Sequence, residues 1–388
     1  MKRVSVIGIG NTRYGVIKDR SFLDLAVEAG KKAMADAGIT PDEVEAFYLG
    51  NYAGSDFINQ NHLAPYVGAA LGVRRDIPCT HIENACASGG SAVREGIVAI
   101  GSETAKKVLV IGVEKMNTVP TPKVTEFLAK AGDWEHEVKV GYTFPSAFAM
   151  MARRHMHQYG TTREHLAAVT VKNHKNALLN PDAQMQKPVT MEQILNDNRV
   201  VADPLRLYDC SLITDGASAV VLAEKGTARN LSKKPVDIIG FAQANDSFAL
   251  YQKDDLTRFD ATVEGANMAF QMAGIEREDI DVAEVHDCFT IAEIIAIEDL
   301  GFVPKGEGGP ATLDGVTSLN GKFAVNTSGG LKAKGHPVGA TGVGQIVEIV
   351  EQLRREAEGR QVKNAEIGLT HNLGGSGATC VVHILARG

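Results

Sequence analysis

The sequence contains the same unit twice, and this repeat constrains the fold more than any other feature of the chain. A twenty-residue segment that begins at Val27 matches, without gaps, a segment that begins at Val263, and both contain an Ala-Gly-Ile turn. An apolar run precedes each segment and another follows it. Apolar residues inside each segment recur at helical spacing, and the glycine after them is typical of a helix C-terminus. Each half is therefore predicted to contain a strand, a helix and a second strand.

Both halves also continue in the same way. A glycine-rich segment leads into a helical pattern and then into an apolar strand, at 85–100 and 107–112 in the first half and at 329–353 and 367–370 in the second. Strands that alternate with helices favour layered α/β architecture. We expect a layered α/β fold built from two duplicated halves with mixed sheets.

A region of different character separates the halves. It contains scattered prolines and two helical patterns, one over 147–159 and one that begins at 161–164. Long structureless loops are uncommon, so we interpret this region as an inserted loop domain that sits on the first half. The expected domains are an N-terminal half, 1–113 and 210–233, the insertion, 114–209, and a C-terminal half, 234–388.

Composition argues against several classes of function. The net charge of −7 disfavours general nucleic-acid binding, so no nucleic-acid partner is expected. No apolar run approaches the ~18 residues of a membrane span, so no membrane association is expected. Five cysteines, an odd number in a long chain, are typical of free thiols in a reducing compartment. We expect a cytoplasmic protein.

Cys86 is the first candidate for chemistry. It lies among small residues directly before a helical pattern. Unpaired N–H groups and the helix dipole at such a position favour the thiolate, which is the nucleophilic form of cysteine. The alternative is a small buried hydrophobic residue, which is how most free cysteines behave.

His336 is the candidate base. It lies between Gly335 and Pro337, in a run whose glycines fix an unusual backbone path. Histidine titrates near neutral pH, so His336 can take a proton from a thiol. The alternative is a turn histidine with a local hydrogen bond.

A second histidine and a second cysteine follow an apolar strand. In a strand-to-helix turn, His286 and Cys288 can both border a pocket. Asp287, between them, is expected to cap the helix that begins at Thr290. Further along, the glycines that include Gly374 allow close backbone approach and could present N–H groups to an oxyanion.

Basic residues concentrate in the insertion. Between residues 151 and 175 the chain has five Lys or Arg residues and one acidic residue. This excess suits a phosphorylated cofactor, and a solvated helix face is the alternative. No metal site is expected, because His155 and His157 have the wrong spacing for two ligands on one helical face. The candidate cofactor-binding residues are Arg153, Arg154, Lys172 and Lys175.

Together these segments resemble the thiolase family. The resemblance covers the whole chain and rests on the Cys86 segment, the sequence TDGASA at 214–219, the run GHPVGATG at 335–342 and the duplicated halves with an insertion. The His-Asp-Cys-Phe box at 286–289 resembles the sterol-carrier-protein type of thiolase and its bacterial and archaeal relatives. Many thiolases have a catalytic cysteine before the final glycines, where this chain has Asn372.

The resemblance implies a layered α-β-α-β-α architecture with an inserted loop domain. It also implies an acyl-CoA C-acyltransferase that acts on coenzyme A thioesters and holds no permanent cofactor. It would condense two acyl-CoAs or cleave a 3-oxoacyl-CoA, with acetyl-CoA and acetoacetyl-CoA as the expected pair. Cys86 would carry the acyl group, His336 would activate its thiol, and Cys288 would move the α-carbon proton. His286 and His336 would hold the enolate oxygen in one oxyanion hole. The N–H groups of Cys86 and Gly374 would form the other.

The resemblance also implies partners. A homodimer or homotetramer is expected, with the strand at 107–112 as a contributor to the interface, and some relatives pair with a small zinc-ribbon and OB-fold protein. The alternatives are a degradative thiolase for a larger 3-oxoacyl-CoA, a ketoacyl-synthase-like condensing enzyme and a non-catalytic acyl-CoA-binding subunit. The His-Asp-Cys-Phe box argues against the second, and the retained cysteines and histidines argue against the third.

Overall fold

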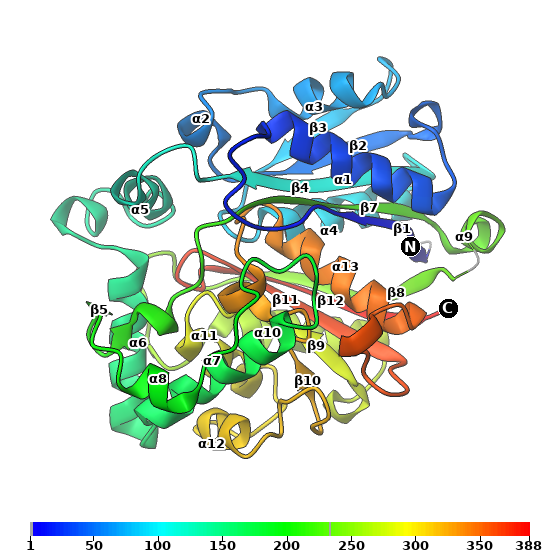
Figure 1. Cartoon of the computed structure of the whole chain (residues 1–388). Helices are drawn as coiled ribbons and strands as arrows, with labels where there is room; N and C mark the ends of the chain where they lie inside the picture. The colour runs from blue at the N-terminus through cyan, green and yellow to red at the C-terminus, as the bar shows by residue number, and fades with distance from the viewer. Residues whose placement is uncertain (1–2, 233) are drawn as a thin grey trace.

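Ten strands form one mixed sheet in the computed structural model, which describes residues 3–232 and 234–388 (Figure 1). Residues 1, 2 and 233, at the ends of the predicted N-terminal half, lie outside the described residues. The strands of the sheet are β1 (Val4–Asn11), β2 (Ala46–Gly50), β3 (Cys79–Ile82), β4 (Lys107–Lys115), β7 (Asp215–Glu224), β8 (Val236–Asn245), β9 (Val282–Glu284), β10 (Ala324–Val325), β11 (Ile367–Gly374) and β12 (Thr379–Arg387). A separate hairpin pairs β5 (Val200–Ala202) with β6 (Leu205–Arg206).

The helices alternate with these strands. In chain order they are α1 (Phe22–Ala37), α2 (Gly54–Phe57), α3 (Leu63–Leu71), α4 (Ser88–Gly101), α5 (Thr121–Ala129), α6 (Phe144–Tyr159), α7 (Arg163–Ala177), α8 (Met191–Leu195), α9 (Lys225–Leu231), α10 (Asp260–Ala273), α11 (Thr290–Asp299), α12 (Gly308–Leu313) and α13 (Thr341–Arg354).

The repeat in the sequence is also a repeat in the structure. The first half of the sheet has the strand order β3-β2-β4-β7-β1, and the second half has the equivalent order β10-β9-β11-β12-β8. In both halves the first three strands are parallel and the last two pairings are antiparallel. The predicted fold class, two duplicated α/β halves with mixed sheets, is confirmed. The two half-sheets are also joined, because three residues of β1 pair with β8.

One close contact recurs in both halves and explains a repeated glycine. A Cβ on Gly8 would lie 2.2 Å from the carbonyl oxygen of Ala33, and a Cβ on Gly240 would lie 2.3 Å from that of Ala269. These glycines let α1 and α10 lie directly on their strands. Both helices then end at a left-handed glycine, Gly38 or Gly274 in the two repeats, as the sequence predicts.

Three apolar clusters of side chains pack the helices against the sheet. In β4, Leu109 and Ile111 pack against α1 and α3, whereas Val108 and Val110 face a central cluster that includes α4 and α13. The third cluster joins α10 and α11 to the second half-sheet. Figure 1 shows α4 and α13 between the two half-sheets. No helix in the described part of the chain is long and apolar enough to cross a membrane.

The insertion packs mainly on the second half, so the expectation that it sits on the first half is wrong. Leu166 and Val169 of α7 belong to the apolar cluster that contains Ile291 and Ile294 of α11. α7 also lies along α12 and along the turn Gly330–Lys334. Both apolar and polar contacts hold α7 there, because Lys172 donates to the carbonyl of Val325, Asn173 to the Asp287 carboxylate and Asn176 to the carbonyl of Asn326.

β4 cannot contribute its edge to an interface between copies. It lies inside the sheet, parallel to β2 on one side and antiparallel to β7 on the other. The expectation for the strand at 107–112 is therefore wrong, because both backbone edges of that strand are already hydrogen-bonded. Among the described strands, β3 is the one at this end of the sheet.

Candidate active site

The four side chains predicted to react meet in one cavity of about 340 Å³. Cys86 comes from the loop between β3 and α4, and His336 from the loop before α13. His286 and Cys288 come from the turn between β9 and α11. One donor atom from each of Cys86, His286 and His336 lies within 4.8 Å of the other two. The structure thus places a thiol beside two imidazoles, which is the arrangement that an activated cysteine requires.

The insertion supplies much of the apolar wall of this cavity. Leu128 of α5 and Phe144 and Phe148 of α6 line it. Val201 and Leu207 also line it and are 44% and 45% exposed, so they lie where the cavity opens to solvent. None of the described residues that line the cavity is Lys or Arg.

A strained loop holds Cys86 in place. Ala85 has a φ of 49°, in the left-handed region that residues with a side chain rarely adopt. Its N–H donates to Glu83 Oε1 at 2.7 Å, and its carbonyl accepts the Ser88 hydroxyl at 2.6 Å. These bonds offset the backbone strain, which is common at functional sites. α4 begins at Ser88, so Cys86 lies two residues before the helix.

Cys86 is a neutral thiol in the resting protein. Burial, followed by the nearby Glu114 carboxyl group, raises the pKa of the Cys86 thiol to about 12. The N–H of Gly375 bonds to the sulfur and acts in the opposite direction, but it does not outweigh burial. Burial therefore acts against the helix N-terminus, which by itself favours the thiolate. Cys86 requires a base to become a nucleophile.

His336 provides that base. Its Nδ1 lies 2.7 Å from Thr341 Oγ1, and the Thr341 hydroxyl donates to the carbonyl of Pro337 at 3.2 Å. With the hydroxyl hydrogen on the Pro337 carbonyl, both contacts are hydrogen bonds only if Nδ1 of His336 carries the ring proton, so we assign the proton to Nδ1 and leave Nε2 to accept. Burial lowers the pKa of His336 to about 3, so the ring is neutral at pH 7.

His286 and Cys288 are also neutral groups. The rings of His286 and His336 meet edge to face, with centroids 5.0 Å apart and an interplanar angle of 86°. Burial, with a contribution from His336, lowers the pKa of His286 well below its usual value. Burial and the neighbouring Cys86 raise the pKa of Cys288 well above its usual value. The cluster can therefore exchange protons without holding a buried charge beforehand.

The same cluster contains the donors of a zinc site. Thiol and imidazole groups are the side chains that zinc prefers, and neutral imidazoles are ready to bind it. Three such donors within 4.8 Å also suit a nucleophile and its base. The expectation that this chain holds no metal is not tested by the geometry and stays a prediction.

Asp287 anchors the loop that leads to His336. Its carboxylate accepts the N–H of Leu331 at 2.6 Å and the N–H of Lys332 at 3.1 Å. The expectation that Asp287 caps α11 is wrong, because the helix begins after Phe289 and no side chain caps it. The Asp287 side chain is instead directed to the turn Gly330–Lys334, so it connects the His-Asp-Cys-Phe box to the second histidine loop.

Glu114, which no sequence motif marks, joins three segments next to the cavity. This buried residue at the end of β4 accepts N–H groups from Tyr52 at 3.0 Å, Ala53 at 3.3 Å and Gly339 at 3.1 Å. Burial raises the pKa of Glu114 to about 7. The only signal in the sequence is an acidic residue at the end of an apolar strand.

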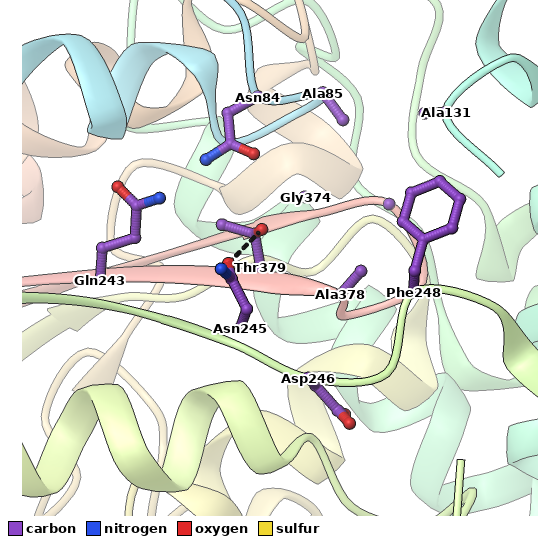
Figure 2. Close-up of a pocket in the computed structure, with 11 residues that line it drawn as sticks. Asn84, Ala85, Ala131, Gln243, Asn245, Asp246, Phe248, Gly374, Ala378 and Thr379 are labelled. Carbon is purple, nitrogen blue, oxygen red and sulfur yellow. Dashed lines mark hydrogen bonds between the residues drawn. The ribbon is translucent and has the colours of Figure 1, made fainter. Parts of the chain in front are cut away.

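The glycine turn after β11 reaches the nucleophile through Gly375. Gly375 lines the cavity, and its N–H bonds to the Cys86 sulfur. Gly374, the last residue of β11, packs on the loop between β3 and α4. A Cβ on Gly374 would lie 2.7 Å from the carbonyl oxygen of Asn84 in that loop. Figure 2 shows Asn84 and Gly374 on the wall of an adjoining cavity of about 380 Å³, which shares Ala131 and Gly375 with the first. An oxyanion hole at Gly374 stays a prediction.

The four basic residues predicted to bind the cofactor do not line the cavity. Lys172 is buried, and its ammonium group lies 2.9 Å from the Glu293 carboxylate. The prediction is wrong for Lys172, because its charge is already paired inside the protein. Arg153 and Arg154 are exposed on α6, and Lys175 is exposed on α7. For these three residues, binding of the cofactor stays a prediction.

We expect Asp287→Ala to lower the free energy of unfolding by at least about 2 kcal/mol, because two buried N–H groups lose their acceptor at about 1–3 kcal/mol each. Denaturation in urea measures this change. Asp279→Ala is the control, since Asp279 is exposed and accepts one N–H from Glu276 at 2.9 Å. The control substitution should lower the free energy of unfolding by about 1 kcal/mol or less. Equal losses in the two variants would contradict the anchoring role.

Comparison with known proteins points to one family. The family model described as "Thiolase, N-terminal domain" matches residues 4–226, and the one described as "Thiolase C-terminal domain-like" matches residues 242–387. The acetyl-CoA acetyltransferase of Methanothermobacter thermautotrophicus is 52% identical over 387 residues, and the match covers 100% of both chains. Human sterol carrier protein 2 is 35% identical over 401 residues, with 98% of this chain and 71% of that protein covered.

A solved structure agrees with these sequence matches. The structure named Ltp2-ChsH2(DUF35) aldolase is similar with a TM-score of 0.85 and 28% identity, and the match covers 99% of this chain and 98% of that chain. The two family models cover residues 4–226 and 242–387, and the relatives and the solved structure match nearly the whole chain. The chain belongs to the thiolase family of acyltransferases.

Proposed function

We propose that this protein condenses two molecules of acetyl-CoA to acetoacetyl-CoA, or cleaves acetoacetyl-CoA with coenzyme A, through an acyl group on Cys86. The observation that carries the proposal is a neutral thiol within 4.8 Å of two neutral imidazoles at a largely apolar cavity. The name of the 52% identical relative, an acetyl-CoA acetyltransferase, supports the choice of acyl group.

Acyl transfer begins with the proton of Cys86. His336 takes this proton as the sulfur attacks the thioester carbonyl of the first acetyl-CoA. The bond from the carbonyl carbon to the coenzyme A sulfur then breaks, a bond to Cys86 Sγ remains, and His336 returns the proton to the departing thiolate. Coenzyme A leaves as a thiol, and the site is again uncharged.

Cys288 moves the proton of the α-carbon. In the direction of cleavage, Cys86 attacks the 3-keto carbon, the carbon–carbon bond breaks, and its electron pair forms the enolate of acetyl-CoA. The Cys288 thiol then donates its proton to the α-carbon, and acetyl-CoA leaves. Coenzyme A gives its thiol proton to the Cys288 thiolate and attacks the acetyl carbonyl carbon, the bond from that carbon to Cys86 Sγ breaks, and Cys86 takes back the proton held by His336. The raised pKa of Cys288 keeps the proton of its thiol in place at pH 7.

In the reverse direction Cys288 first passes this proton to the neutral His336, and its thiolate then takes the α-proton of the second acetyl-CoA. The resulting enolate forms the carbon–carbon bond with the acetyl carbonyl carbon, the bond from that carbon to Cys86 Sγ breaks, and the departing Cys86 thiolate takes the proton from His336.

Hydrogen-bond donors stabilise the two oxyanions. We assign the enolate oxygen to His286 and to His336 after His336 has taken a proton on Nε2, and the tetrahedral oxyanion to the N–H of Cys86 and the turn that contains Gly374. Loss of one such donor typically raises the barrier by ~3 kcal/mol. A carbon-bound proton is a weak acid, so stabilisation of the enolate must supply much of the rate.

The apolar wall suits the thioester end of coenzyme A, which binds as a substrate. Arg153, Arg154 and Lys175 remain candidates for contacts with its phosphates. Thiolysis of 3-oxoacyl-CoAs of increasing chain length tests the acyl group. Acetoacetyl-CoA should have the highest kcat/KM, whereas a maximum at a longer chain would favour the degradative alternative.

Cys86→Ala should abolish the acetyl adduct that forms when the protein is incubated with acetyl-CoA, because no nucleophile remains. Intact-protein mass spectrometry measures the adduct. Cys210 lines the same cavity, so Cys210→Ala is a matched control that should keep it. An adduct of unchanged yield in Cys86→Ala would falsify the assignment of the acyl carrier.

Cys288→Ala should still accept an acetyl group on Cys86 but should lose condensation and thiolysis by roughly 10²–10⁴-fold, the usual range for one acid/base group. It should also stop exchanging the α-protons of acetyl-CoA for deuterium in D₂O, which NMR of the substrate measures. Exchange at the parental rate would mean that another group, His286 or His336, moves the proton.

We also propose that the protein is at least a homodimer. β3 lies at one end of the sheet, and its Thr80 and His81 are exposed. The carbonyls of Pro78 and Ile82 accept N–H groups from the β2 side, so the backbone groups of Cys79 and His81 face away from β2. A strand edge of this kind can pair with the same edge of a second copy.

Light scattering at micromolar concentration should therefore give at least twice the mass of one chain. His81→Pro removes an N–H from the free edge and should weaken the dimer, whereas His81→Ala keeps the N–H and should not. A single species of the mass of one chain in the parental protein would refute the proposal. A zinc-ribbon and OB-fold partner protein stays a prediction. The name of the similar structure, Ltp2-ChsH2(DUF35) aldolase, joins two proteins, which supports testing this chain for a partner protein.

A further inference from the structure

We infer that Asn372 is a positioning residue that fixes the tautomer of His286, so that His286 presents an N–H to the reacting oxygen. The effect of this tautomer on catalysis rests on the proposed function, whereas the tautomer itself is a property of the resting protein. Asn372 lies on β11 and is 1% exposed. An amide does not ionise near neutral pH, so Asn372 cannot itself move the α-carbon proton.

Two backbone groups fix the orientation of the Asn372 amide. Its Oδ1 accepts the N–H of Gly90 at 3.1 Å, and its Nδ2 donates to the carbonyl of Cys86 at 2.9 Å. The flipped amide would place Nδ2 against an N–H and Oδ1 against a carbonyl, which leaves both pairs repulsive. The amide therefore has one favourable orientation.

This orientation decides where the hydrogen of His286 lies. Nδ2 of Asn372 is 3.3 Å from Nδ1 of His286, and an amide nitrogen can only donate. Nδ1 of His286 must accept, so the single hydrogen of the neutral ring is on Nε2. The low pKa of His286, caused first by burial, keeps the ring from taking a second proton at pH 7.

The two imidazoles of the site consequently have opposite tautomers. Thr341 holds His336 with its hydrogen on Nδ1, which leaves Nε2 to accept the proton of Cys86. Asn372 holds His286 with its hydrogen on Nε2, which makes that nitrogen a permanent donor. One ring is thereby prepared as a base and the other as an oxyanion donor, and a protonated Nε2 also disfavours metal binding by His286.

The surrounding backbone leaves the amide no room to move. A Cβ on Gly342 would lie 2.2 Å from Asn372 Oδ1, and a Cβ on Gly90 would lie 2.8 Å from it. Gly90 is in the first turn of α4 and Gly342 is in the first turn of α13. The first turns of α4 and α13 therefore enclose the Asn372 amide. Because α4 belongs to the first half and α13 to the second, the packing of the two halves determines the tautomer of His286.

Solid-state ¹⁵N NMR of protein labelled at histidine tests the tautomer directly and does not depend on the size of the assembly. The signals of His286 are identified by their loss in His286→Gln. In the parental protein, Nδ1 of His286 should have the shift of an unprotonated nitrogen and Nε2 that of a protonated one. Asn372→Asp places a carboxyl oxygen opposite Nδ1 and should reverse the pattern. A protonated Nδ1 in the parental protein overturns the inference, whatever the variants do.

A double-mutant cycle tests the consequence. Asn372→Leu should slow α-proton exchange of acetyl-CoA by roughly 10²–10³-fold, the usual loss for one oxyanion donor. In the His286→Gln background it should slow exchange by less than about threefold, because a residue that acts through another is not additive with it. Equal losses in both backgrounds overturn the inference in favour of a purely structural role. Absence of exchange and of an acetyl adduct in the parental protein would instead contradict the proposed function, and the NMR result would stand.

Discussion

The active site depends on a close contact between the backbones of the two halves. A Cβ on Gly89 of α4 would lie 2.7 Å from the carbonyl oxygen of Gly339, and a Cβ on Gly112 of β4 would lie 2.5 Å from the same atom. Only glycine permits this approach, since real Cβ contacts are longer. The loop before α4 carries Cys86 and the loop before α13 carries His336, so this contact brings the nucleophile to its base.

Burial then determines the chemistry that these groups can perform. The pKa of Cys86 is raised and the pKa values of both histidines are lowered, with burial as the first cause in each case. A charged thiolate–imidazolium pair would have to be desolvated in this cavity, whereas the neutral pair costs less. Proton transfer is therefore postponed until a thioester is in place and the oxyanion donors can stabilise the charge that develops.

Buried polar side chains next to the cavity fix the positions of the reacting groups relative to one another. Asp287 ties the His286 turn to the loop that leads to His336, and Glu114 ties β4 to the loop after β2 and to Gly339. Asn372 connects Cys86 to His286. Each of these residues accepts or donates at least two hydrogen bonds between segments that are distant in the sequence. Such contacts supply the orientation that catalysis by preorganised groups requires.

Local patterns in the chain are enough to identify the repeat, the α/β class and the family, because helical periodicity, glycine caps and short motifs are local signals. It also singled out Cys86, His286, Cys288 and His336, since those residues stand in recognisable segments. It could not determine their protonation, because burial arises from neighbours that the chain supplies from elsewhere. The local helix favours a Cys86 thiolate, whereas burial by residues from both halves raises the pKa of the thiol.

Tertiary structure alone decided the remaining features. The insertion packs on the C-terminal half because buried apolar and polar side chains of α7 have their partners there. The strand β4 cannot pair with a second copy because it is paired on both sides. Lys172, one of the basic residues of the insertion, is paired with Glu293, which lies more than a hundred residues further along the chain. Hydrogen bonds and ion pairs between distant segments leave no periodic trace in a sequence. They become defined only when the two halves close on each other.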